Sequence, residues 1–162
     1  MEATAVARDI KVQRTRHERL KQFLVLYARV ALGAGFLSSV ADRFGLWGPP
    51  GSPRAAWGNW SNFVRYTAVL NFFLPNRTAP ILAVIVTISE FSLGVLLILG
   101  LWKRQVAALS AGLLCLFALT MSVALGVKAP LDYSVFSASA AAAMLFVWAD
   151  ERKIAGGEVG AS

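Results

Sequence analysis

A long run of residues without a charged side chain constrains this chain more than any other feature. Residues 105–127 contain no ionisable group except the thiol of Cys115. A helix needs about 20 apolar residues to cross a bilayer core of about 30 Å, so the run predicts a membrane-spanning helix. The whole chain is 57% hydrophobic and only 15% charged, whereas soluble domains carry about 25% charged residues. This composition favours a small integral membrane protein over a soluble enzyme or a disordered chain.

Four apolar segments predict an all-α fold, a four-transmembrane-helix bundle. The predicted spans are residues 23–44, 79–102, 104–126 and 131–149. The last of them is short and rich in alanine, so a buried re-entrant helix is the alternative there. A further segment, residues 61–74, is too short to span the membrane. It predicts an interfacial or partly re-entrant helix between the first two spans, which Ser61 caps and Pro75 ends.

The distribution of basic residues predicts how the chain is oriented. Residues 1–22, the turn at 103–104 and residues 150–162 contain ten Lys and Arg residues, against five in the segments expected on the opposite side. Cytoplasmic segments are enriched in basic residues, so both termini are expected in the cytoplasm. We therefore expect a multi-pass membrane protein, with cytoplasmic tails at 1–22 and 150–162 and a transmembrane domain at 23–149. The net charge of +7 then indicates contact with the lipid bilayer and no nucleic-acid partner.

The chain has one cysteine and one histidine, which limits its metal and redox chemistry. Cys115 alone forms no intramolecular disulfide, and His17 alone does not make a bis-histidine haem site. We expect no metal site, and no cofactor held covalently or through metal ligands. Any redox centre would then belong to a partner subunit.

Arg29 and Glu90 are the candidate catalytic residues, because they are the two strong charges expected deepest in the bundle. At helical rise, Arg29 lies about 12 Å and Glu90 about 19 Å from the same membrane edge. A charge at that depth needs a partner, so the two are expected to pair or to share a hydrogen-bond network. Gly33 and Phe36 share the face of Arg29, whereas Ala83, Thr87 and Gly94 share the face of Glu90. The pair is either a structural ion pair or a site that handles protons or holds a quinone headgroup.

A second polar group is expected at the opposite membrane face. It comprises Asn71, Lys128, Asp132 and Tyr133. One interpretation is an ordinary helix N-terminus, with Asp132 in the first turn of the last span. The other is a polar rim around a ligand-binding mouth, in which Tyr133 donates a hydrogen bond to a carbonyl such as a quinone oxygen.

Several stretches in a fixed order resemble the DoxX family of bacterial membrane proteins. They are ARVALGAGFLSS, YTAVLNFFLP, TISEFSLGVLLILGLWKR and FALTMSVALGVKAPLDYSVFSAS, and they cover about Tyr27 to Val147. The resemblance implies a four-helix transmembrane bundle in the bacterial inner membrane. It also implies a link to quinone chemistry, because the family takes its name from a subunit associated with thiosulfate:quinone oxidoreductase. By this analogy Arg29 and Glu90 are the intramembrane polar pair.

Three functions remain open from the sequence. The first is a quinone-associated accessory subunit of a membrane oxidoreductase, with the redox centre on a partner; whether the chain is itself an enzyme stays open. The second is a non-enzymatic scaffold or assembly factor that docks a partner through the interfacial helix. A small-molecule transporter is the third, and four short spans without a visible inverted repeat disfavour it for a monomer. Self-association as a homo-oligomer is also left open.

Overall fold

The computed structural model describes the backbone of residues 2–157 and the side chains of residues 12–149. Every regular element in these residues is a helix, which confirms the predicted all-α class. The elements are α1 (Glu2–Arg43), α2 (Trp60–Leu70), the 3-10 helix η1 (Asn76–Thr78), α3 (Ala79–Leu99), α4 (Lys103–Leu125), α5 (Lys128–Asp132) and α6 (Val135–Gly157). The predicted tail at 150–162 lies partly outside the described residues, and α1 continues through most of the predicted tail at 1–22.

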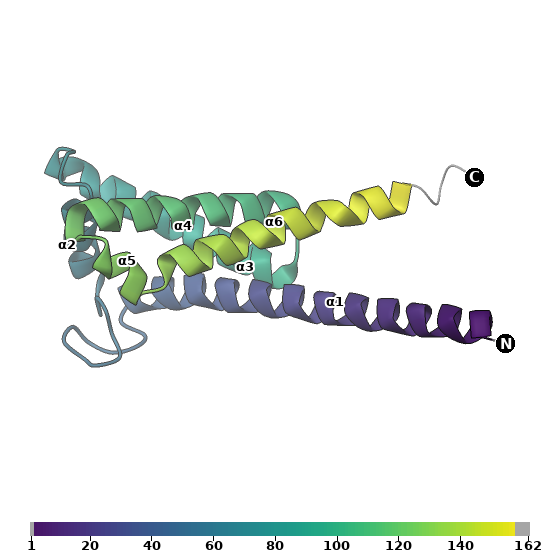
Figure 1. Cartoon of the computed structure of the whole chain (residues 1–162). Coiled ribbons are helices and arrows are strands. Elements are labelled where there is room, and N and C mark those ends of the chain that lie inside the picture. The colour runs from purple at the N-terminus through teal and green to yellow at the C-terminus, as the bar shows by residue number, and fades with distance from the viewer. Residues whose placement is uncertain (1, 158–162) are drawn as a thin grey trace.

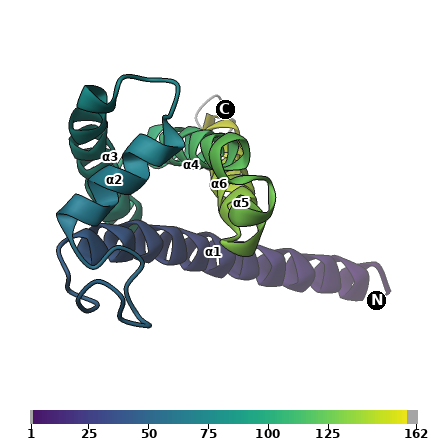
Figure 2. The same ribbon diagram turned by 90° about the vertical axis from the view of Figure 1, so that its left-hand side faces the viewer.

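Four long helices run side by side and give the molecule two distinct ends (Figure 1). The start of α1 and the end of α6 lie at one end, which we call the terminal end. The loop at 44–59, α2 and α5 lie at the other, which we call the capped end. Helix α1 packs against α3 and α4 packs against α6, as the view along the bundle shows (Figure 2). Each half is thus a helical hairpin whose two long helices are joined through a short helix.

Three helices are long and apolar enough to cross a membrane. They comprise Val12–Arg43, Asn76–Leu99 and Lys103–Leu125. On α4, Leu109, Leu116 and Val123 are each more than half exposed, and their seven-residue spacing places them on one face of the helix. An exposed apolar stripe on a long helix is a surface for lipid, so the chain is a membrane protein in contact with the bilayer.

The fourth predicted span differs most from the structure. Its apolar part, Val135–Ala149, is shorter than a typical span. Ser134 has a φ of +56°, which breaks the helix and separates α5 from α6. Helix α6 therefore begins at Val135 instead of residue 131. A fourth crossing of the membrane stays a prediction.

The interfacial helix also begins and ends at different residues from those expected. Asn59 caps α2, and its side-chain oxygen accepts a hydrogen bond of 2.8 Å from the backbone N–H of Asn62. The predicted cap, Ser61, is wrong because it already lies inside the helix. The helix ends at Leu70, before Pro75, because Asn71 provides a cap whose N–H bonds to the carbonyl of Thr67.

Two glycines allow α1 and α3 to approach closely. A Cβ added to Gly33 would lie 2.8 Å from the backbone oxygen of Gly94, and one added to Gly94 would lie 3.1 Å from that of Gly33. Both glycines are buried. Phe36, Ala83 and Thr87 are buried on the same two helices, so the interior faces predicted for α1 and α3 are confirmed. This crossing sets the register in which the functional residues meet.

Candidate functional site

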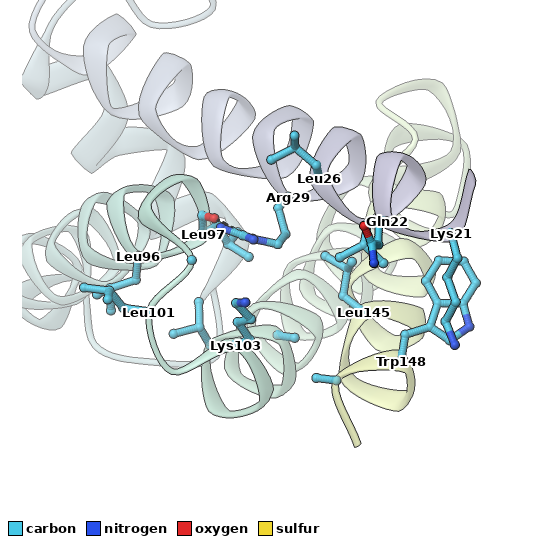
Figure 3. Close-up of a pocket in the computed structure, with 15 residues that line it drawn as sticks. Lys21, Gln22, Leu26, Arg29, Leu96, Leu97, Leu101, Lys103, Leu145 and Trp148 are labelled. Carbon is cyan, nitrogen blue, oxygen red and sulfur yellow. Dashed lines mark hydrogen bonds between the residues drawn. The ribbon is translucent and has the colours of Figure 1, made fainter. Parts of the chain in front are cut away.

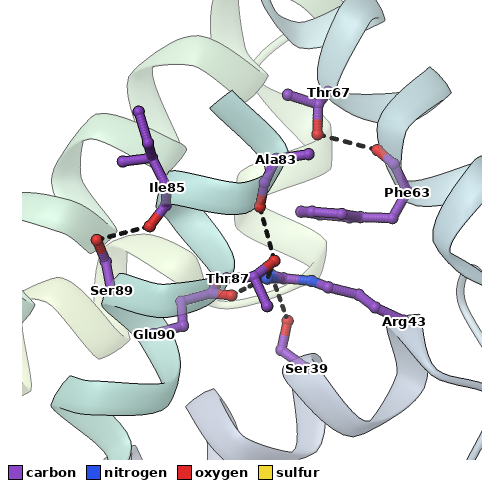
Figure 4. Close-up of polar contacts among 9 residues, drawn as sticks. All are labelled: Ser39, Arg43, Phe63, Thr67, Ala83, Ile85, Thr87, Ser89 and Glu90. Carbon is purple, nitrogen blue, oxygen red and sulfur yellow. Dashed lines mark hydrogen bonds and ion pairs between the residues drawn. The ribbon is translucent and has the colours of Figure 1, made fainter. Parts of the chain in front are cut away.

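The centre of the candidate site is a buried ion pair between α1 and α3. Arg43, the last residue of α1, forms it with Glu90, and the side chains are only 1% and 4% exposed. The guanidinium also donates to the hydroxyl of Thr87 at 2.6 Å and to that of Ser39 at 3.3 Å. Figure 4 shows these groups converging on Arg43 from both helices. We call Ser39, Asp42, Arg43, Thr87 and Glu90 the Arg43 cluster.

Aromatic rings from the capped end enclose the other side of Arg43. The central guanidinium carbon lies 3.7 Å from the ring centroid of Phe63 in α2 and 5.6 Å from that of Trp57 in the preceding loop. A guanidinium at these distances from a ring face is attracted by the ring's quadrupole. Arg43 thus holds α1, α3, α2 and the loop together at one point.

Asp42 fastens the loop from the next position along the chain. Its side chain is buried, and Oδ2 accepts hydrogen bonds from the backbone N–H groups of Ala56 at 3.0 Å and Trp57 at 2.8 Å. These bonds fold the loop back onto the end of α1. Asp42 Oδ1 and Arg43 Nε are buried without a hydrogen-bond partner in the described structure.

The structure corrects the predicted partner of Glu90, which is Arg43 instead of Arg29. Arg29 Nε donates to the carbonyl of Leu97 at 2.9 Å, and Nη2 donates to that of Ile98 at 3.2 Å. It therefore binds carbonyl oxygens in the last turn of α3, where a cation is favoured by the helix dipole. Glu90 lies about 10 Å further along the helix from Leu97, at 1.5 Å per residue.

Register and side-chain direction explain this choice of partner. With Gly33 opposite Gly94 in an antiparallel pair, the level of Glu90 falls near residue 37 of α1. Helical side chains lean toward the N-terminus of their own helix. Arg43 therefore leans toward the level of Glu90, and Glu90 leans toward the capped end, whereas Arg29 leans away from it. The glycine spacing and this directional rule were the sequence signals for Arg43.

The predicted polar rim is only partly assembled. Lys128 and Asp132 form an ion pair within α5, with side chains 84% and 58% exposed. Asn71 donates its side-chain amide to the carbonyl of Thr67 at 2.9 Å and so serves α2. Tyr133 is largely exposed, and it lies near enough to Tyr66 of α2 to contribute to that residue's raised pKa. Ligand binding by these four residues stays a prediction.

An apolar groove runs beside the Arg43 cluster at the capped end. Its volume is about 440 Å³, and Phe44, Trp60, Val84, Thr87 and Ile88 line it. Thr87 belongs to both the groove and the cluster, because its hydroxyl accepts from Arg43 and donates to the carbonyl of Ala83. The groove therefore opens next to buried charge.

Elsewhere the described side chains show less chemistry. Within residues 12–149, whose side chains the structure describes, no group of three His, Cys, Asp or Glu residues lies close enough to hold a metal ion. Cys115 is exposed on α4. The Arg43 cluster remains the strongest candidate, and what its geometry achieves directly is to fix the capped end onto the bundle.

The fold and this site define a class, a small polytopic helical membrane protein with a charge-stabilised cap. The family whose sequence model matches the chain is MauE, described as methylamine utilisation protein MauE, over residues 21–132. The match covers more than half of the chain, so the protein belongs to the MauE family. The resemblance to DoxX is therefore wrong, since MauE is a different family. No curated protein and no solved structure matches the chain.

Proposed function

We propose that this is a membrane-embedded accessory protein of methylamine utilisation that holds a partner protein at its capped end. The name of its family supports the pathway. The family match includes the whole capped end, from the end of α1 through α5. In this proposal the capped end faces outward from the bacterial inner membrane and both termini face the cytoplasm, as the basic residues predict.

The observation that carries the proposal is that adjacent residues, Asp42 and Arg43, both bind the cap. Asp42 holds the backbone of the loop, and Arg43 lies against Phe63 of α2 while it pairs with Glu90. Separating Arg43 from Glu90 would leave a buried charge without its partner, which is strongly unfavourable. The loop and α2, which Asp42 and Arg43 bind, therefore keep one arrangement. A pre-organised surface binds a partner with less loss of conformational entropy.

The capped end also offers large exposed side chains to a partner. At least three fifths of Phe44, Leu46, Phe72, Phe73 and Tyr133 is exposed. Aromatic residues are enriched in the centres of protein interfaces. These residues are therefore the surface on which we place the partner.

Site-specific photocrosslinking in native membranes tests this proposal. A photoreactive amino acid at Phe72 is expected to crosslink a protein of methylamine utilisation during growth on methylamine. The same probe at Leu109, which is exposed on α4, is the matched control and is expected to crosslink lipid alone. The same protein crosslinked at both positions, or none at Phe72, would refute the proposed surface.

The apolar groove supports a second candidate function, quinone binding with the redox centre on a partner subunit. Its wall of aromatic and branched apolar side chains suits a flat, lipid-soluble ring, and buried charge lies directly beside it. This candidate predicts that quinone co-purifies with the protein and quenches tryptophan fluorescence. Replacement of Trp60 by Phe would then reduce the quenching, because Trp60 lines the groove. Purified protein without quinone and without quenching would exclude it.

A further inference from the structure

A basic cavity lies at the terminal end, the end of the bundle opposite to the Arg43 cluster. Its volume is about 130 Å³, and α1, α3, α4 and α6 all contribute to its wall. Its basic lining residues are Lys21, Arg29 and Lys103, and none of the described residues that line it is acidic. Figure 3 shows Arg29 and Lys103 on different helices around the same space, with Lys21 and Trp148 at its edge. Such a wall favours an anionic ligand.

The charge of Arg29 is held in place. Its guanidinium bonds to the carbonyls of Leu97 and Ile98. Gly100 leaves the room that this requires, because a Cβ there would overlap with Arg29 Nη2. Lys103 is the first residue of α4, so the positive end of that helix dipole adds to the same potential.

Apart from the side-chain amide of Gln22, the rest of the cavity wall is apolar. It includes Leu26, Leu101, Leu145 and the indole of Trp148. Tryptophan rings favour the headgroup layer of a membrane. Leu99 ends one candidate span and Lys103 begins the next, so the cavity lies at the depth where lipid headgroups meet hydrocarbon.

We propose that this cavity binds the phosphate group of an anionic phospholipid, with its acyl chains along the apolar wall. Basic pockets between membrane helices are suited to phospholipid headgroups. A free phosphate ion would match the three basic residues but would leave the apolar wall unused, which favours the lipid. The inference is independent of the proposed function, because it concerns the opposite end of the bundle.

Native mass spectrometry of the purified full chain tests this, with phosphatidylglycerol and phosphatidylcholine as the added lipids. We expect preferential retention of phosphatidylglycerol. Each basic residue near an anionic lipid contributes about fivefold to affinity, so the variant K21Q/K103Q is expected to bind it about 25-fold more weakly. If the double variant unfolds, the single variant K103E tests the positive charge at the cavity instead, because Lys103 is exposed.

The matched control is R16Q/R19Q, which removes the same charge from an exposed part of α1 that does not line the cavity. It is expected to retain phosphatidylglycerol as the wild type does. Equal losses in both double variants, or equal retention of the two lipids, would overturn the proposal. Displacement of the lipid by millimolar inorganic phosphate would also overturn it, by assigning the cavity to a free phosphate ion.

Discussion

Arg43 and Glu90 form a buried ion pair that joins the last residue of α1 to the middle of α3. The same guanidinium lies against Phe63 of α2. One side chain therefore determines how the two hairpin helices and the cap are placed together. Two opposite charges buried side by side offset part of each other's desolvation cost, whereas a single buried charge has no such compensation.

Replacement of Glu90 by Ala is expected to lower the free energy of unfolding by about 3 to 5 kcal/mol, because Arg43 would stay buried without its carboxylate. Unfolding in mixed detergent micelles measures this. The control is Asp132→Ala, which breaks the exposed pair with Lys128 and is expected to cost under about 1 kcal/mol. Similar losses in the two variants would contradict a dominant role for the buried pair.

Replacement of Gly33 by Ala is expected to separate α1 from α3. The new Cβ would lie 2.7 Å from a side-chain carbon of Ile98 and 2.8 Å from the backbone oxygen of Gly94. The backbone of α3 cannot move away without a large cost in free energy. We expect a loss of about 2 kcal/mol. Gly35→Ala, on the same helix with nothing within 4 Å, is expected to stabilise by about 0.5 to 1 kcal/mol. Thermal unfolding of both variants tests the contrast, and equal shifts would refute the close crossing.

Replacement of Gly100 by Ala is expected to expel the Arg29 guanidinium from the end of α3. The residue has a φ of +71°, so some strain arises from the backbone alone. Gly51→Ala controls for that strain, since it also has a positive φ but no atom within 4 Å. We expect Gly100→Ala to lose about 1 to 2 kcal/mol more than the control, because the two carbonyl bonds are lost. Hydrogen exchange at the end of α3 reports the change, and unaltered protection would argue against it.

Stability at alkaline pH is expected to depend on Tyr66. Burial raises the pKa of Tyr66 above its ordinary value of 10.0, and the nearby Tyr133 adds to the shift. The folded state therefore holds this proton more tightly than the unfolded state. The stabilisation is complete below pH 10 and is lost as the pH rises through the folded-state pKa.

Tyr66→Phe removes this titration, so the variant is expected to lose less stability than the wild type between pH 8 and pH 11. Parallel unfolding of the two proteins at both values measures the difference. The lysines and the remaining tyrosines are present in both proteins, so the comparison isolates the titration of Tyr66 together with its interaction with Tyr133. Identical pH dependence in the two would show that Tyr66 does not contribute.

Much of the helical framework could be predicted from hydropathy and helix periodicity. The apolar runs identified three candidate spans, and three- and four-residue steps identified the interior faces that carry Gly33 and Gly94. The last helix was harder, because positive φ at a single residue, Ser134, separates α5 from α6. No residue preference in the sequence marks a serine for that conformation.

The candidate site was predicted in part, with Glu90 correct as the buried acid and Arg29 wrong as its partner. Depth from one membrane edge favoured Arg29, whereas the direction in which helical side chains lean favours Arg43. The role of Asp42 depends on a long-range contact with the backbone of Trp57. Such a contact is set by the folded path of a loop rich in glycine and proline, which local patterns do not determine.

Growth on methylamine tests the central claim, that Asp42 and Arg43 fix the cap for an accessory role in methylamine utilisation. A deletion strain would be complemented with Asp42→Ala, or with Arg77→Gln as an exposed control at the capped end. We predict that Asp42→Ala accumulates in the membrane but fails to restore growth on methylamine, whereas Arg77→Gln restores it. Normal growth with Asp42→Ala, together with a loop at 44–59 that exchanges hydrogen faster, would contradict the account.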